Sequence, residues 1–95
     1  MSELIHLGAR DAARRLAAGS LRSETLIAAC LERIAAREPA VGAWAHIEPE
    51  RALAEARARD REAPRGPLHG VPIAVKDIMN TADLPTGYGS RAYEG

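Results

Sequence analysis

The sequence contains no phenylalanine and only three aromatic residues, one tryptophan and two tyrosines. Leucine, isoleucine and valine together occupy 18 positions, whereas alanine occupies 20. Burial stabilises a fold by about 25 cal/mol per Å² of apolar surface, and alanine has little surface to bury, so the chain can build only a thin core of its own. Clear apolar periodicity and a net charge of zero still exclude a disordered composition. We therefore expect the chain to form the helical flank of a larger core.

No stretch of the chain concentrates charge of one sign. Thirteen cationic residues balance 13 anionic ones, which leaves no electrostatic footprint for nucleic acid. No apolar run is long enough to span a bilayer, and the first residues lack the basic start and apolar stretch of a secretory signal. We expect no direct nucleic-acid partner, no membrane partner and a cytoplasmic location.

Cysteine occurs once, so Cys30 cannot form an internal disulfide, which suits a reducing compartment. Its place on an apolar helical stripe predicts a buried, inert thiol. His6, His46 and His69 show no spacing typical of a metal site. We predict neither a metal nor a cofactor, and we interpret His69 as a loop residue that is hydrogen-bonded for shape.

The apolar periodicity predicts three helices. The first covers residues 9–18 and is closed by Gly19 in the left-handed conformation. The second begins at Ser23 as its N-cap and is stopped by Pro39. The third starts at Pro49, which suits a first helical turn, and extends to about residue 62.

Two strands are predicted beside these helices. Residues 41–47 alternate in a way typical of a strand, and the apolar run at 71–75 indicates a strand buried on both faces. The predicted fold class is therefore α/β, and we expect residues 1–95 to be the N-terminal part of a single domain. In that domain, residues 1–62 form a mainly helical flank. Residues 63–95 form a loop, the buried strand and a final irregular segment.

The only lysine, Lys76, follows the second predicted strand, whereas the other 12 cationic residues are arginines. Arginine cannot lose its proton in a protein, but a desolvated lysine can, and it then serves as a base. Strand ends and the loops after them are where α/β folds place reactive groups. The alternative is a strand-end lysine whose amine simply lies in water.

The run from Gly66 to Asp77, GPLHGVPIAVKD, resembles the entry segment of the amidase signature family of serine amidohydrolases. The run at 83–93, DLPTGYGSRAY, resembles the segment that follows it, and the preceding helices are similar to the family's N-terminal region. The resemblance implies a mixed sheet covered by helices, of which this chain holds the N-terminal helices and first strands.

The resemblance also implies a Ser–cis-Ser–Lys triad that hydrolyses carboxamides through an acyl-enzyme. Lys76 matches the catalytic lysine, which in this family moves a proton through the middle serine. Both triad serines belong to a glycine- and serine-rich segment that the 95 residues do not contain, so we expect this stretch to be inactive alone. We assign Ser20 and Ser23 structural roles, and Ser90 lies in a different motif.

The resulting hypothesis is an amidase acting on a small-molecule amide, with Lys76 as its catalytic residue; a homodimer of the complete enzyme is left open. Within the same family, the alternative is the glutaminase subunit of a tRNA-dependent amidotransferase. We rank it second because residues 77–90 look more like stand-alone amidases. An alternative of another class is a non-catalytic helical binding or scaffold module.

Overall fold

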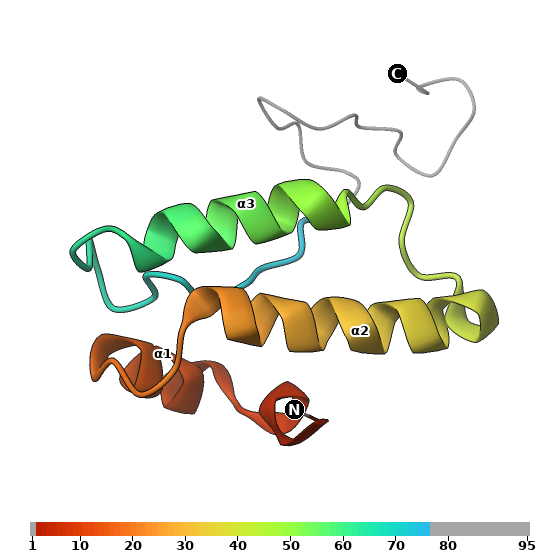
Figure 1. The fold of residues 1–95 in the computed structure, drawn as a ribbon. Helices are drawn as coiled ribbons and strands as arrows, with labels where there is room; N and C mark the ends of the chain where they lie inside the picture. Colours follow the sequence, from red (N-terminus) through yellow and green to blue (C-terminus); the bar gives the residue numbers. More distant parts are fainter. Residues whose placement is uncertain (1, 77–95) are drawn as a thin grey trace.

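The computed structural model describes residues 2–76, which form helices joined by loops. A short 3₁₀ helix, η1 (Ser2–His6), precedes three α-helices: α1 (Ala9–Ala17), α2 (Ser23–Val41) and α3 (Pro49–Asp60). Helix α2 lies in the middle, with α3 along one side and with η1 and α1 on the other (Figure 1). An extended segment at 71–76 ends the described chain.

Helix α1 and its predicted end are confirmed. Gly19 follows the C-cap residue and has φ 78°, a left-handed conformation that glycine adopts without strain. Its N–H donates to the Leu16 carbonyl at 3.2 Å, and the Ser20 N–H donates to the Arg15 carbonyl at 3.0 Å. These bonds satisfy carbonyls that would otherwise lack partners in the last turn.

Helix α2 differs from its prediction at both ends. Arg22 is the N-cap and Ser23 is the first helical residue, so the N-cap predicted at Ser23 is wrong by one position. Pro39 does not stop the helix, which continues to Val41. Proline removes one N–H donor from the helical ladder, but here it does so in the last turn, where few further bonds depend on it. The helix ends at Gly42, whose φ is 61°.

The strand predicted at 41–47 is wrong. Val41 is the last residue of α2, and residues 42–48 are an irregular connection to α3. The Glu38 carboxylate accepts the backbone N–H groups of Ala43 at 2.9 Å and Trp44 at 2.6 Å. The alternating side chains therefore meet no partner strand among the described residues, and their backbone is held instead by one glutamate at the end of the helix.

The helices pack through small side chains, as the composition predicts. Helix α3 begins at Pro49, in agreement with the sequence, and turns Ala56 toward the interior with 3% exposure. The buried apolar residues among residues 4–76 are few: Ala12, Leu26, Ala29 and Ala56. No large side chain in that range is completely enclosed. The thin core is confirmed, and alanine lets helix axes approach closely while contributing little burial.

The prediction of a buried strand at 71–75 is wrong for the described structure. Residues 71–76 form no strand, and Ile73 and Val75 are 82% and 42% exposed. A strand needs a neighbour to satisfy its backbone groups, and residues 2–76 contain no other strand. The sheet of the predicted α/β fold is thus absent from this part of the chain, where helices alone are present.

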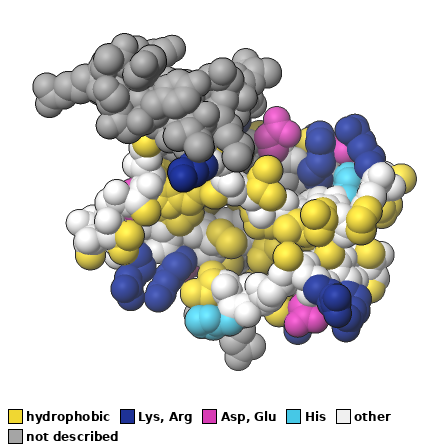
Figure 2. Space-filling view, turned by 180° about the vertical axis from the view of Figure 1, so that it is seen from behind, with side chains coloured by type: hydrophobic (Ala, Val, Ile, Leu, Met, Phe, Trp, Pro, Cys, Tyr) yellow, Lys and Arg dark blue, Asp and Glu magenta, His cyan; other side chains and the backbone are white. Residues whose placement is uncertain are grey.

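Apolar side chains gather over the middle of one face of the molecule (Figure 2). Large apolar residues that are exposed include Val41, Leu68, Ile73 and Val75.

None of the described helices is long and apolar enough to cross a membrane.

Candidate functional site

Lys76 stands at the end of the described chain and is exposed. It follows an extended segment that leaves a tight turn at 66–70, in which the His69 N–H donates to the Gly66 carbonyl at 3.2 Å. The Val71 N–H donates to the Leu68 carbonyl at 3.0 Å. Other polar residues near Lys76 in the sequence, Asp77 and Ser90 among them, lie outside the described residues.

Gly70 is the point where this turn contacts the helices. Its φ is 83°, a left-handed conformation that other residues adopt only with strain. A Cβ atom at this position would lie 3.3 Å from the Ser23 Cβ and 3.6 Å from the Leu16 Cδ1. Both the backbone conformation and the close approach therefore require glycine here.

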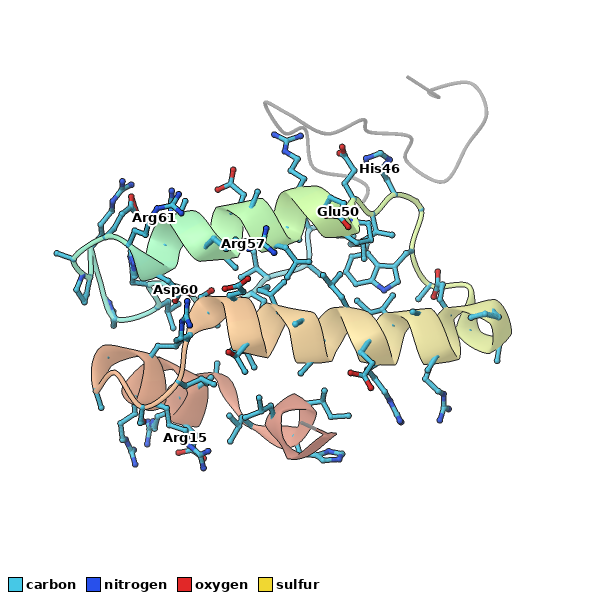
Figure 3. All side chains as sticks on the ribbon, viewed as in Figure 1. Arg15, His46, Glu50, Arg57, Asp60 and Arg61 are labelled. Atoms are coloured by element: carbon cyan, nitrogen blue, oxygen red, sulfur yellow. The ribbon has the colours of Figure 1, made fainter. Side chains whose placement is uncertain are left out.

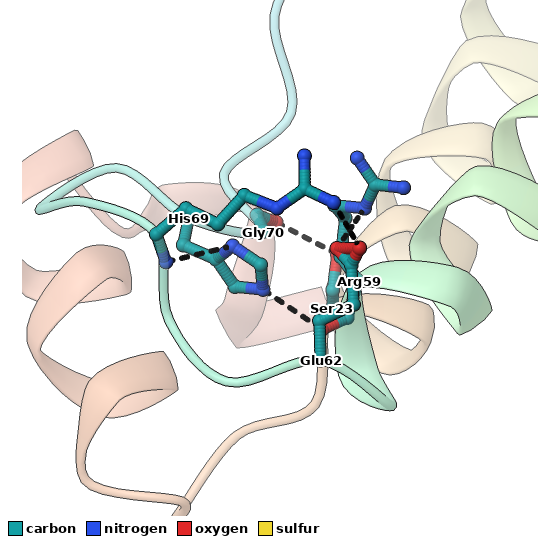
Figure 4. Close-up of polar contacts among 6 residues, drawn as sticks. Ser23, Arg59, Glu62, His69 and Gly70 are labelled. Atoms are coloured by element: carbon teal, nitrogen blue, oxygen red, sulfur yellow. Dashed lines mark hydrogen bonds and ion pairs between the residues drawn. The ribbon is translucent and has the colours of Figure 1, made fainter.

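Ser23 forms the polar half of the same contact. Its side-chain hydroxyl donates to the Gly70 carbonyl at 2.7 Å, and the residue is 2% exposed (Figure 4). The bond is partly buried, and a hydrogen bond of this kind contributes about 0.5–1.5 kcal/mol, so it stabilises the turn against the helix. The structural role expected for Ser23 is confirmed, although the partner is a distant loop instead of its own helix.

Asp60 closes the N-terminus of α2 from the end of α3. Its Oδ1 accepts the Ser23 N–H at 2.6 Å, and its Oδ2 accepts the Glu24 N–H at 2.9 Å. In Figure 3 the Asp60 side chain extends from the end of α3 toward the start of α2. A carboxylate that accepts the free N–H groups of a first turn also interacts favourably with the helix dipole. Asp60 thus replaces the missing side-chain cap of α2.

His69 ties the turn to α3. Its Nε2 lies 2.8 Å from the Arg59 carbonyl, and the Arg65 N–H donates to Nδ1 at 3.4 Å (Figure 4). Because a carbonyl only accepts, Nε2 carries the proton and Nδ1 is the acceptor, which defines a neutral tautomer. The prediction that His69 is hydrogen-bonded for shape is confirmed.

Two carboxylates, those of Glu24 and Glu62, form ion pairs with arginines around this junction. Glu24 pairs with Arg57 at 2.6 Å, and the hydrogen bond from Arg57 to Glu24 raises the pKa of the guanidinium. Glu62 pairs with Arg65 at 2.6 Å and with Arg59 at 2.9 Å. The Arg59 Nε and Glu62 Oε1 atoms are buried without a hydrogen bond, so their contact is an ion pair alone.

The junction borders a shallow depression at the meeting point of α1, α2, α3 and the turn. Its lining includes Leu16, Ser23, Arg57, Asp60, His69 and Gly70. The Ser23 hydroxyl donates its proton to the Gly70 carbonyl, and both ring nitrogens of His69 have hydrogen-bond partners. None of these lining residues therefore offers a hydroxyl next to a base that could activate it, and the contacts of Ser23 and His69 serve to hold the turn against the helices.

Cys30 is half-buried on α2, and burial raises the pKa of its thiol, which favours the unreactive protonated form. Between residues 2 and 76, no group of three or more His, Cys, Asp or Glu side chains is placed to hold a metal ion.

Sequence reasoning missed the contacts that organise the junction. Ser23 and Gly70 are 47 residues apart, and Ser23 and Asp60 are 37 apart, so no local pattern connects them. The signals available were the aspartate at the end of α3 and the glycine at position 70, each of which also has a purely local explanation.

Comparison with known proteins gives the family. The sequence profile of the family described as Amidase matches residues 25–95. The chain is 46% identical over 99 aligned residues to a subunit of the glutamyl-tRNA(Gln) amidotransferase of Chloroflexus aurantiacus, an alignment that covers all of this chain and 20% of that protein. The protein of the same name from Streptomyces coelicolor is 43% identical, with the same coverage. That from Anaeromyxobacter sp. is 45% identical over 97 residues, which is 98% of this chain and 20% of the relative.

The chain spans about a fifth of the length of the curated relatives it matches. No solved structure matches it. The family profile covers most of the chain, including Lys76 and the turn before it. The chain therefore belongs to the amidase signature family, whose N-terminal region it represents.

Proposed function

We propose that the amidase containing this region is the glutaminase subunit of a tRNA-dependent amidotransferase. The observation that carries the proposal is the similarity of the whole chain to proteins named as one subunit of glutamyl-tRNA(Gln) amidotransferase. In this reaction the subunit hydrolyses the glutamine carboxamide to glutamate and ammonia. A partner subunit holds a misacylated tRNA whose glutamyl carboxyl is first activated by phosphoryl transfer from a nucleoside triphosphate. The ammonia then attacks the activated carboxyl and displaces phosphate, which converts the glutamyl group to glutaminyl.

Lys76 is the residue we propose as catalytic. It is the only lysine, it lies in the run that matches the family, and it is exposed at the end of an irregular segment. A serine hydroxyl is a weak nucleophile until a base takes its proton. In the proposed triad, the Lys76 amine takes the proton from the nucleophilic serine through the middle serine. It then returns the proton to the departing nitrogen, which leaves as ammonia.

The second candidate is a stand-alone amidase that acts on a small carboxamide. The sequence of residues 77–90 favours it. Both candidates use the same lysine and the same acyl-enzyme, and they differ in substrate and in dependence on a partner.

The deciding experiment compares the complete protein with and without its partner subunits. We expect ammonia release from glutamine to rise strongly when the partners and misacylated tRNA are present, and glutaminyl-tRNA to form when ATP is also supplied to activate the glutamyl carboxyl. Hydrolysis of simple carboxamides by the isolated protein, with no effect of partners, would instead establish the stand-alone amidase.

The catalytic assignment is tested by Lys76→Arg in the complete protein. Arginine keeps the positive charge but cannot serve as a base, so we expect turnover to be lost while the fold remains. Arg65→Lys is the matched control, because it makes the reverse exchange on the exposed side of the preceding turn. Activity of Lys76→Arg close to that of the unmodified protein would contradict the assignment.

A further inference from the structure

Among the described residues, the turn and the segment that carry Lys76 make few hydrogen bonds to the helices. Two side-chain hydrogen bonds connect the turn at 66–70 to the helices: His69 to the Arg59 carbonyl, and Ser23 to the Gly70 carbonyl. Among the described residues beyond Gly70, the only further hydrogen bond is that of the Val71 N–H within the turn itself. Gly70 is therefore the last polar anchor before Lys76 in the described chain.

The donor at this anchor is rigidly held. Ser23 is 2% exposed and is the first residue of α2, the central helix. Its own N–H is bound at 2.6 Å by Asp60, so the start of α2 is fixed against the end of α3. The hydroxyl thus presents a proton to the Gly70 carbonyl from a position that both long helices define.

The acceptor side is equally constrained. Gly70 has φ 83°, and the space beside its Cα is filled by Ser23 at the distance of a tight van der Waals contact. The hydrogen bond and the close packing together set the direction in which the chain leaves the helices. Lys76 lies six residues further on, an extended length of roughly 20 Å at most. A rotation of a few degrees at Gly70 thus moves the lysine by about an ångström, a displacement that can cost on the order of a hundredfold in rate.

We propose that Ser23 is a positioning residue for Lys76. Its hydrogen bond to the Gly70 carbonyl fixes the direction of the segment that follows, and so places the Lys76 amine next to the reacting groups. The proposal rests on the proposed function, in which Lys76 is the base. Ser23 itself does not contact the substrate; it acts through Gly70.

The test measures kcat and KM for glutamine in the complete protein with its partner subunits. Ser23→Ala removes the hydroxyl, and Ser23→Cys keeps nearly the same volume with a much weaker donor. We expect kcat to fall about tenfold or more in both variants, with KM within twofold of the unmodified protein. Ser20→Ala is the matched control, because that exposed hydroxyl donates at 3.3 Å to the Arg15 carbonyl, near the end of its own helix.

A double-variant cycle adds a readout that general destabilisation would not produce. Gly70→Ala disturbs the same hydrogen bond from the acceptor side. The fold-loss of kcat in the double variant should therefore be smaller than the product of the fold-losses in the two single variants. Unchanged kcat in Ser23→Cys, or a double variant whose fold-loss equals that product, would overturn the positioning role. Lys76→Ala separates the two proposals. If this variant keeps its activity, the catalytic assignment of Lys76 fails. If it is inactive while Ser23→Cys is fully active, only the role of Ser23 is overturned.

Discussion

The Asp60 carboxylate, at the last residue of α3, accepts the backbone N–H of Ser23, at the first residue of α2, at 2.6 Å. A helix start is thus capped by a side chain 37 residues away instead of by its own N-cap residue. This contact joins the two longest helices at one end. The same serine holds the turn that leads to Lys76, so the end of α3, the start of α2 and the turn form one junction.

Removal of the Asp60 carboxylate should lower the free energy of unfolding. We expect Asp60→Ala to cost about 1–2 kcal/mol, the usual range for loss of an N-terminal cap. Asp60→Asn should cost less, because its amide oxygen still accepts one of the two N–H groups. Urea unfolding followed by far-UV circular dichroism measures the difference. Asp11→Ala is the control, since that carboxylate is exposed and makes only a 3.9 Å ion pair with Arg14; equal losses in the two variants would contradict the capping role.

Three glycine-to-alanine substitutions separate backbone strain from close packing. Gly70→Ala combines φ 83° with a Cβ contact at 3.3 Å, so we expect the largest loss, about 2 kcal/mol or more in unfolding free energy. Gly42→Ala adds only strain, since φ is 61° and nothing lies within 4 Å, and should cost about 1 kcal/mol. Gly66→Ala has neither feature and should be neutral or slightly stabilising. Thermal unfolding gives the order, and a loss at Gly66 equal to that at Gly70 would refute it.

Glu48 should make a small contribution to stability that depends on pH. The hydrogen bond from His46, at 2.9 Å, lowers the pKa of the Glu48 carboxyl below its ordinary value of 4.5. A carboxyl whose pKa is lower in the folded state stabilises the fold above its unfolded pKa. That stability is lost as the pH falls through the folded value. The difference in melting temperature between the unmodified chain and Glu48→Gln should therefore shrink below pH 4.5, and a difference that grows on acidification would have the wrong sign.

Cys30 should react slowly with thiol reagents while the chain is folded. Burial raises the pKa of the thiol above 9.0, which lowers the fraction of reactive thiolate at any given pH and also restricts access. Alkylation by iodoacetamide, followed by intact mass, should be several-fold slower in the folded chain than in the same chain in urea at equal pH. Equal rates in the two states would mean that α2 does not shield the sulfur.

Local chemistry determined the helices of this protein. Apolar spacing set the positions of α1 and α3, Pro49 marked the start of α3, and Gly19 ended α1 because only glycine adopts that conformation without strain. The excess of alanine over large apolar residues likewise determined that the buried core would be thin. The family could also be inferred from the sequence, and the run around Lys76 lies within the residues that the family profile matches.

Tertiary contacts decided what the local pattern could not. The alternating residues at 41–47 and the apolar run at 71–75 have patterns typical of strands. A strand forms only where a neighbouring strand pairs with its backbone N–H and carbonyl groups, and residues 2–76 provide no such neighbour. Pro39 lies close enough to the end of α2 for the helix to continue past it. The roles of Ser23, Asp60 and Gly70 depend on atoms that meet across 37 to 47 residues of chain, and only folding brings those atoms within hydrogen-bond distance.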